Sequence, residues 1–557
     1  MAHGFAVGLD YGTESCRAVL LNLASAEVVT SSVYAYPHGV VDRTLPGSGE
    51  RLPQSWALQY PGDYLNGLKT TVRAVVKESG VDPAEIGSLG IDTTACTLIP
   101  TAGQLRPLAL DDKWQNNPYA WAKLWKDHSA QPQADRINML GADRKEEFLK
   151  FYSGRLSSEW AFPKLLKLYE EAPDVFSAAA KVYELCDWLV SLLVGAECRG
   201  AAVAGYKETY QPTTGGYPDA KFLEELASGF SAVTAKLGSE FKAPGASAGT
   251  ITSEWATELG LTPDTIIASS NLDAHVAALG VGISNPNEML LVMGTSVCNL
   301  MMTRDFKEVR GVSGTVFDGL APGYWAYEAG QSGVGDTFGW FVNNLVPERI
   351  QREAQAANSD IFSLLERRAQ TMNPGETGLL CLDWFNGNRS TLQDGGLSGL
   401  VMGLTIGTRA EDVYRCLLEG AAFGQRQIFD AFADAGVEIE RVVACGGIAL
   451  KSPLFMQILA DVLNRPVEVN SSMQGPAVGA ALHAAVAAGE TRGGFSSFEA
   501  ACEIAPATAA TYEPDPARSL RYAPLLKLYK QLYDEFGDKQ PDRMHMLRDI
   551  SAKASVH

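Results

Sequence analysis

The sequence contains the same short pattern twice, once near its start and once just past its middle. Residues 5–23 form an apolar run, a small polar turn with a Gly-Thr pair at 12–13, and a second apolar run. Residues 288–302 repeat this order around a Gly-Thr pair at 294–295. Glycine adds no side chain and tolerates positive φ, so backbone N–H groups in such turns can approach an anion closely. One Gly-Thr hairpin is a weak signal, but the repetition predicts a duplicated domain with a phosphate held between its copies.

The length of the chain supports this duplication. With 557 residues the chain is too long for one hydrophobic core, so we expect two large domains. Gly280, Gly282 and the Asn-Pro-Asn sequence at 285–287 break the pattern between the halves. We therefore expect an N-terminal domain over residues 1–283 and a C-terminal domain over residues 284–557, the latter ending in a helical tail.

The charge and the apolar segments narrow the class of protein. A net charge of −19 argues against general binding to nucleic acid or to an anionic membrane surface. A bound polyphosphate would need local help from backbone amides, a metal ion or a few cations. No uncharged apolar run is long enough to span a membrane, and the nine cysteines include no CxxC pair. We expect a cytoplasmic protein with reduced thiols.

Three acidic residues stand at positions where α/β proteins bind ligands. Asp10 ends the first predicted strand and can hold a divalent cation. Asp92 and the small Ala95 follow a second buried strand, at the end where ligands bind in α/β sheets, although a turn that needs small residues is an equal alternative. Asp273 falls in the first turn of a predicted helix. There it is either a cap stabilised by the helix dipole or a base held at a cleft.

Other candidate residues are ambiguous when taken singly. The tryptophan-rich segment 114–128 is either a helix with Trp121 and Trp125 as core anchors, or a segment in which Trp125 lines a polar pocket. Lys207 lies in a predicted turn of small residues, where an exposed lysine without function is the simpler interpretation. Glu328 lies in a predicted glycine-punctuated turn at 325–333. A strand, a Gly-Gly turn at 446–447 and a capped helix follow the second hairpin.

In series, these features resemble the ASKHA superfamily, which contains sugar kinases, Hsp70 and actin. The segment 446–467 is similar to the signature of the FGGY carbohydrate kinases, with one departure at Ser452, where asparagine is expected. Further segments are similar to the ribulokinase branch of that family, at 90–97, 124–128, 157–160, 204–207, 327–332, 383–389 and 456–458. The resemblance implies an α/β fold of two RNase H-like (actin-like ATPase) domains around a central cleft for ATP and sugar.

The resemblance also implies a reaction and a role for each matching residue. The reaction is ATP-dependent phosphorylation of L-ribulose to L-ribulose 5-phosphate, in L-arabinose catabolism, with Mg²⁺. Asp273 would be the general base, and as a first-turn residue we expect it to keep a low pKa. The sugar would contact Ala95, Trp125, Lys207, Asp273 and Glu328. Asp10 would hold the metal, and ATP would contact Gly12, Thr13, Ser15, Arg17, Gly294, Thr295, Gly446, Gly447 and Lys451.

Two alternatives stay open from the sequence. The first is another FGGY kinase that acts on xylulose, D-ribulose, glycerol or another polyol. The hairpins cannot decide between these acceptors, whereas Trp125, Lys207 and Glu328 favour L-ribulose. The second is a nucleotide switch of the actin or Hsp70 kind with no small-molecule acceptor. We expect a ketopentose as the partner, neither nucleic acid nor membrane, and an oligomeric state that the sequence leaves open, a homodimer included.

Overall fold

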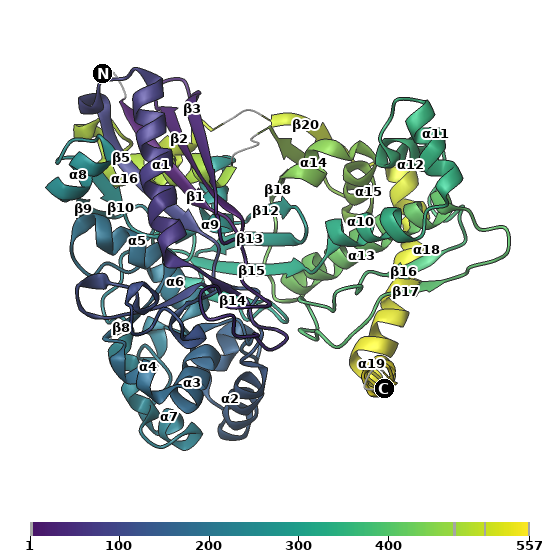
Figure 1. The fold of residues 1–557 in the computed structure, drawn as a ribbon. Helices are drawn as coiled ribbons and strands as arrows, with labels where there is room; N and C mark the ends of the chain where they lie inside the picture. Colours follow the sequence, from purple (N-terminus) through teal and green to yellow (C-terminus); the bar gives the residue numbers. More distant parts are fainter. Residues whose placement is uncertain (1–3, 472–474, 506–507, 555–557) are drawn as a thin grey trace.

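The chain folds into two bodies that face each other (Figure 1). The computed structural model describes residues 4–471, 475–505 and 508–554. The first body contains the N-terminal half, drawn in purple and blue, and the second contains most of the remainder, drawn in green and yellow. No helix in these three ranges is long and apolar enough to cross a membrane.

The first body is built on a seven-stranded sheet. Its order is β3-β2-β1-β5-β10-β9, with β11 also paired to β5. The strands are β1 (Phe5–Tyr11), β2 (Ser15–Asn22), β3 (Val28–Ala35), β5 (Ile86–Thr93), β9 (Ser247–Thr250), β10 (Ile266–Ala268) and β11 (Asn271–Leu272). The first three strands are antiparallel neighbours, β1, β5 and β10 are parallel, and β9 is an antiparallel edge strand.

The second body repeats this topology. Its sheet has the order β14-β15-β13-β12-β18-β19-β20. The strands are β12 (Glu288–Met293), β13 (Val297–Thr303), β14 (Gly314–Phe317), β15 (Trp325–Gln331), β18 (Arg441–Cys445), β19 (Val467–Asn470) and β20 (Thr508–Tyr512). Again an antiparallel trio adjoins parallel strands, β12, β18 and β19, and an antiparallel edge, β20. The two Gly-Thr hairpins are therefore equivalent elements, as their sequence repetition predicted.

Helices and two small sheets complete both bodies. In the first half they are α1 (Pro61–Ser79), α2 (Gln131–Arg144), α3 (Ala161–Glu171), α4 (Pro173–Ala178), α5 (Leu185–Val194), α6 (Ala201–Lys207), α7 (Ala220–Leu226), α8 (Ser253–Leu259) and α9 (Asp273–Gly280). In the second half they are α10 (Val334–Asn344), α11 (Glu348–Ala356), α12 (Ile361–Gln370), α13 (Ala410–Asp434), α14 (Gly447–Lys451), α15 (Pro453–Leu463), α16 (Gly475–Ala488), α17 (Phe498–Cys502), α18 (Pro516–Tyr533) and α19 (Asp542–Ala554). The small sheets contain β4 (Leu58–Gln59), β6 (Leu98–Thr101), β7 (Ala122–Lys123) and β8 (Lys181–Glu184), and β16 (Leu380–Leu382) with β17 (Leu400–Met402).

Helix α16 belongs to the second half of the sequence but packs on the first sheet. It contacts β1, β5 and α9, and Figure 1 shows it among the elements of the first body. Glycines permit this close approach: a Cβ atom on Gly8 would lie 1.9 Å from the carbonyl oxygen of Ala477, and one on Gly90 would lie 2.1 Å from that of Ala480. The chain thus returns to its first body after building the second, and the domain boundary near residue 283 stays a prediction.

Three local predictions are wrong. The segment around Glu328 is not a turn but the strand β15. The segment 114–128 is not one helix, because it contains only a short 3₁₀ turn at Pro118–Ala120 followed by β7. Asn117 caps that turn by accepting a hydrogen bond from the backbone N–H of Tyr119 at 3.0 Å. Lys207 is neither in a turn nor exposed: it ends helix α6 and is 4% exposed. A buried lysine needs a partner, and this one has its partner in the other half of the chain.

Candidate functional site

Acidic side chains converge at one edge of the first sheet. Asp10 near the end of β1 is in register with Asp92 near the end of β5, and Asn271 of β11 is in register with Asp92 on its other side. Asp273 starts α9, two residues after Asn271. Since the carboxyl ends of parallel strands meet at the same edge, the sheet topology itself gathers these side chains.

Asp92 is the most deeply buried member of this group. Its side chain is fully buried, and neither carboxylate oxygen has a hydrogen-bond donor. Burial raises its pKa well above the ordinary value, and the charges of Asp10 and Asp273 add to the shift. Burial also raises the pKa of Asp10, although Arg17, its partner in register on β2, lowers it in part. The edge is therefore a place where negative charge is poorly compensated by protein groups.

The environment of Asp273 overturns the predicted low pKa. Its Oδ1 atom accepts a hydrogen bond from the backbone N–H of the next residue, Ala274, at 2.6 Å, and α9 has no side-chain cap. Burial and, next, the Asp10 carboxylate nevertheless raise its pKa to about 7, against the opposing effect of that hydrogen bond. Asp273 is thus poised to exchange a proton near neutral pH.

The acidic edge suits a magnesium ion. Among residues 4–471, 475–505 and 508–554, no three or more His, Cys, Asp or Glu side chains form a complete metal site. Magnesium does not need one, because it keeps several water molecules and binds one or two carboxylates together with substrate phosphates. Asp10 and the buried, donor-less oxygens of Asp92 supply oxygen ligands of the right kind. The residues present therefore fit the ion.

Each hairpin turn is closed by a backbone hydrogen bond from its glycine, to the third residue after it in the first turn and to the second in the other. The N–H of Gly12 donates to the carbonyl of Ser15 at 2.9 Å, and the N–H of Gly294 donates to that of Ser296, also at 2.9 Å. Gly294 and its neighbour Thr295 are exposed, while Gly12 and Ser15 are half-buried. Both turns can therefore present backbone to an anion.

Trp125 is hydrogen-bonded to the first hairpin turn and belongs to the part of the site that is predicted to bind sugar. Its indole Nε1 donates to the hydroxyl of Thr13 at 3.0 Å. Buried Lys164 supports the same region, because its ammonium donates to the carbonyls of Cys96 at 2.7 Å and Leu124 at 2.8 Å. These bonds fix the turn that carries the partly exposed Ala95 next to the turn that carries Trp125. Trp125 is half-buried, packs against a hydrophobic cluster and bonds to the first hairpin turn, so its place in a sugar pocket stays a prediction.

The Gly-Gly turn lies against the second hairpin. Gly446 has φ of +95°, and a Cβ atom there would lie 2.5 Å from the carbonyl oxygen of Met293, so only glycine fits. Gly447, which begins α14, is exposed, and a Cβ atom added to it would meet no atom within 4 Å. Lys451 ends α14 and is exposed. The turn therefore leaves open space beside the hairpin, and Ser452 is occupied in capping α15.

A buried charged group lies across from the acidic edge. Lys207 of α6 donates to Glu328 of β15 with its Nζ atom 3.0 Å from Oε2, which joins the two halves of the chain. Arg389 donates to the other oxygen of Glu328, and His275 Nε2 lies 3.7 Å from Oε2. Burial would raise the pKa of Glu328, but Lys207 and Arg389 outweigh it and lower the pKa to about 2. Burial lowers the pKa of His275 to about 4, so the imidazole is neutral.

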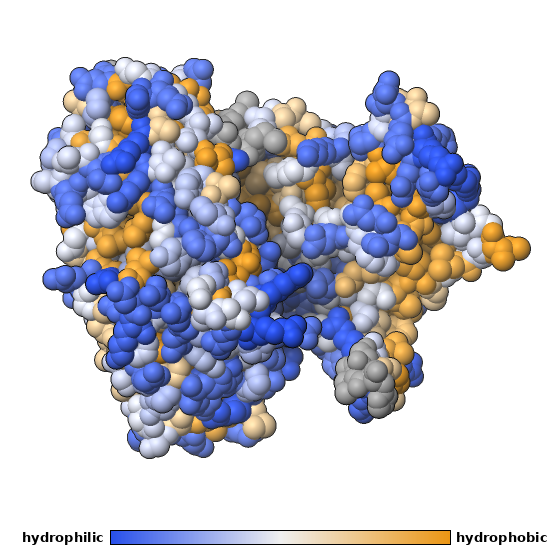
Figure 2. Space-filling view, viewed as in Figure 1, coloured by the Kyte–Doolittle hydropathy of each residue, from blue (hydrophilic) through white to orange (hydrophobic). Residues whose placement is uncertain are grey.

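Two members of this charged group were not predicted as site residues. Arg389 lies in the polar loop 383–389, which resembles the family but whose residues were given no role, and His275 follows Asp273 by two residues on α9. The charges of Asp10, Glu328 and Lys207 all affect the pKa of Asp273, so Asp273 lies near both the acidic edge and the charged group. Figure 2 shows the surface hollowed between the two bodies from which these residues come.

Comparisons with known proteins agree with this geometry. The FGGY family of carbohydrate kinases matches with its N-terminal domain over residues 5–280 and its C-terminal domain over residues 289–488. A ribulokinase from Shouchella clausii (strain KSM-K16) is 45% identical, over 99% of this chain and 98% of the relative. A ribulokinase from Mycolicibacterium smegmatis is 42% identical, over 99% and 97%.

Solved structures share the fold. A xylulose kinase from Rhodospirillum rubrum has a TM-score of 0.77 at 22% identity, over 95% of this chain and 98% of that one. A Plasmodium falciparum glycerol kinase with ADP has a TM-score of 0.76 at 17% identity, over 95% and 98%. The predicted fold of two actin-like α/β domains is confirmed. The family matches and the full-length ribulokinase relatives together show that the chain belongs to the FGGY family of carbohydrate kinases.

Proposed function

We propose that this kinase transfers the γ-phosphoryl group of ATP to the terminal hydroxyl of L-ribulose, giving L-ribulose 5-phosphate. The observation that carries the proposal is that Asp273 starts α9 at the sheet edge of Asp10 and Asp92 and also lies near the charged group of Lys207 and Glu328. A base in this position has phosphate-binding elements on one side and hydrogen-bonding groups for a polyhydroxylated acceptor on the other. The ribulokinase names of relatives that are 42–45% identical support the choice of ribulose.

The chemistry assigned to Asp273 is proton acceptance. The acceptor oxygen forms a bond to the γ-phosphorus, the bond from that phosphorus to the bridging oxygen of ADP breaks, and the hydroxyl proton passes to the Asp273 carboxylate. Such transfers require mainly alignment and charge neutralisation, so a weak base is enough. A pKa of about 7 leaves Asp273 about half ionised at neutral pH in the ligand-free protein.

The remaining residues would align the reactants. Lys207 and Glu328 offer donors and acceptors to sugar hydroxyls, while Trp125 and Ala95 shape the same side of the pocket. Gly12, Thr13, Ser15 and Arg17 would contact the phosphates from the first body. Gly294 and Thr295 would contact them from the second, with Gly446, Gly447 and Lys451 on the adenosine side. Facing bodies that close over the reactants would also exclude water and limit ATP hydrolysis.

Magnesium is part of the proposal. Asp10 would hold the ion with help from Asp92, and when bound the ion supplies positive charge to the phosphates of ATP. Titration calorimetry of Mg²⁺ with ADP present should show weaker binding for Asp10→Asn than for wild type. Equal affinities would remove Asp10 from the metal site. We also propose a cytoplasmic location, in keeping with nine free cysteines.

The acceptor is identified by a substrate screen. Purified protein is assayed with ATP, Mg²⁺ and L-ribulose, D-ribulose, D-xylulose, L-xylulose, ribitol, L-arabinitol and glycerol, with ADP release as the readout. L-Ribulose should have the highest kcat/KM. A higher value for xylulose or glycerol would replace the substrate and keep the kinase assignment, whereas ATP turnover that no acceptor raises would overturn the kinase assignment itself.

A further inference from the structure

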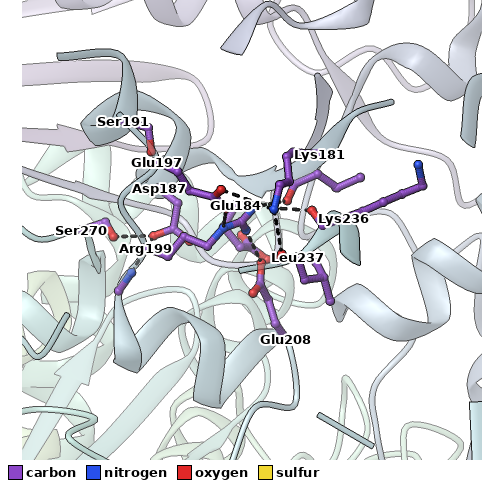
Figure 3. A network of polar contacts seen from close by, with 12 residues as sticks. Lys181, Glu184, Asp187, Ser191, Glu197, Arg199, Glu208, Lys236, Leu237 and Ser270 are labelled. Atoms are coloured by element: carbon purple, nitrogen blue, oxygen red, sulfur yellow. Dashed lines mark hydrogen bonds and ion pairs between the residues drawn. The ribbon is translucent and has the colours of Figure 1, made fainter. Parts of the chain in front are cut away.

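A second buried charged group spans the two ends of α6 and contains none of the residues assigned to ATP or sugar. Its centre is Arg199, whose side chain is fully enclosed (Figure 3). The guanidinium donates to Glu197 at 2.9 Å through Nε, to Glu208 at 3.3 Å through NH1, and to the carbonyl of Val182 at 2.9 Å through NH2. Removing such a charge from water costs several kcal/mol, and an apolar cluster of similar volume is often as stable. Stability alone therefore does not explain this buried ion pair, and the positioning of neighbouring elements is an alternative role for it.

Arg199 and Glu208 stand at the two ends of α6. Arg199 lies two residues before the first residue of the helix, and Glu208 follows its last residue, Lys207. Both side chains of this ion pair are fully buried. A seven-residue helix has little stability of its own, so the ion pair between its ends helps to set where the helix stops. Lys207 projects from that end to Glu328, with the two side chains 3.0 Å apart.

Asp187 of α5 links the start of α6 to the segment that carries Asp273. A single oxygen, Oδ1, accepts the N–H of Gly200, the N-cap of α6, at 3.0 Å and also the hydroxyl of Ser270. Ser270 lies between β10 and β11, three residues before Asp273. Figure 3 shows Asp187 and Ser270 facing each other beside Arg199. One buried carboxylate therefore holds together the elements that carry Lys207 and Asp273.

We propose that Asp187, Arg199, Glu208 and Ser270 form a positioning network that sets the base, Asp273, relative to the sugar-binding Lys207. None of the four touches a group assigned to ATP. One branch, the bond between Asp187 and Ser270, positions the base. The other branch, the ion pair between Arg199 and Glu208, positions the lysine. Because this role presupposes the proposed sugar-kinase function, each branch is tested with a matched pair of variants in an assay that also tests that function.

Ser270→Ala and Ser269→Ala test the branch to the base. The two serines are adjacent and buried, at 1% and 2% exposure, and each hydroxyl donates one hydrogen bond. Only Ser270 bonds to Asp187, whereas Ser269 bonds to the carbonyl of Ala243 at 2.8 Å. Misplacement of a reacting group is costly, so Ser270→Ala should lower kcat for L-ribulose by at least about tenfold with both KM values nearly unchanged. Ser269→Ala should stay within about twofold of wild type.

Glu208→Gln and Glu197→Gln test the branch to the lysine. Each change removes one carboxylate from Arg199, but only Glu208 adjoins Lys207. Glu208→Gln should raise the KM for L-ribulose by at least about fivefold, because a displaced lysine binds the sugar less well, and should leave the KM for ATP unchanged. Glu197→Gln should change neither constant by more than about twofold. This pair decides the matter if Ser270→Ala fails to fold.

The outcomes separate the network from the function. Unfolding midpoints are measured for all four variants, since a purely structural role predicts losses of activity that follow the loss of stability. If wild type is active and the members of each pair behave alike, or activity only follows stability, the positioning network is overturned alone. A wild type that phosphorylates no ketopentose overturns the proposed function and the network with it.

Discussion

Replacing Asp273 with asparagine should abolish phosphoryl transfer and at the same time stabilise the ligand-free protein. Asparagine has the shape of aspartate, and its side-chain oxygen can still accept the N–H of Ala274, which lies 2.6 Å from Oδ1. It cannot take the hydroxyl proton, so kcat should fall by about 10²- to 10⁴-fold. It also carries no charge, whereas the Asp273 carboxylate is disfavoured by burial and by the nearby Asp10 carboxylate.

The size of the stabilisation follows from the pKa of Asp273. Burial and Asp10 raise it from 3.8 to about 7 in the folded protein. A carboxyl group whose pKa is raised by folding makes its full contribution to the free energy of unfolding below its unfolded-state pKa. That contribution is lost as the pH rises through the folded-state pKa. A shift of about three units corresponds to at most about 4 kcal/mol, and partial solvent exposure reduces this to about 1–2 kcal/mol. Asparagine avoids this loss.

The assay is thermal unfolding of wild type and Asp273→Asn without nucleotide or metal, at several pH values between 4 and 8. The midpoint of the variant should exceed that of wild type most at pH 8, and the difference should shrink steadily toward pH 4. Asp174→Asn is the control, because Asp174 occupies the first turn of α4 on the exposed surface, where neutralisation loses a favourable helix-dipole interaction.

Two results would refute the reasoning. If Asp273→Asn is no more stable than wild type at pH 8, the ionised Asp273 carboxylate does not destabilise the ligand-free protein. If the gain is the same at all pH values, it comes from packing rather than from the ionisation of Asp273. A stabilised but inactive variant, with a gain that depends on pH, is the signature expected of a functional carboxylate.

Three further predictions follow from the same geometry. The kcat/KM for sugar should fall about tenfold per unit below pH 7, since Asp273 must be ionised to accept a proton; a flat profile down to about pH 5 would exclude a base of this pKa. Lys207→Ala should raise the sugar KM by about tenfold to a hundredfold, from the loss of a charge-assisted hydrogen bond, and leave the ATP KM unchanged; an unaltered sugar KM would remove Lys207 from the pocket. Gly90→Ala should lower the unfolding midpoint strongly, because its Cβ atom would lie 2.1 Å from a backbone oxygen of α16. Gly103→Ala should not, because its Cβ atom would meet no atom within 4 Å. Equal midpoints for the two variants would mean that α16 does not pack as described.

The sequence predicts the parts of this molecule that depend on neighbouring residues. Alternating apolar runs and a Gly-Thr turn define a hairpin locally, so both hairpins are recognisable, and their repetition reveals the duplication. The positions of Asp10 and Asp273 follow in the same way from strand and helix ends. These local signals, together with the family resemblance, were sufficient to predict the fold.

The parts that the sequence misjudged depend on distant partners. Lys207 was expected to be exposed because its partner Glu328 lies 121 positions away. Asp273 was expected to have a low pKa because helix position alone was considered, while Asp10 and Glu328 approach it from separate elements. Arg389 belongs to a family-like segment, but its role was missed for the same reason, since only tertiary structure brings it to Glu328. Local patterns thus locate the site, and its electrostatics require the fold.

The return of α16 to the first body has a consequence for biosynthesis. All strands of the first sheet have been made once Leu272 is translated, but the helix that covers β1 and β5 begins only at Gly475. At ordinary translation rates the first sheet waits on the order of 10–40 s for this helix, with an apolar face uncovered. The N-terminal half therefore cannot complete its folding on the ribosome before most of the second half has emerged. A fragment that stops at the middle of the chain should aggregate, and co-expression of the second half should rescue it.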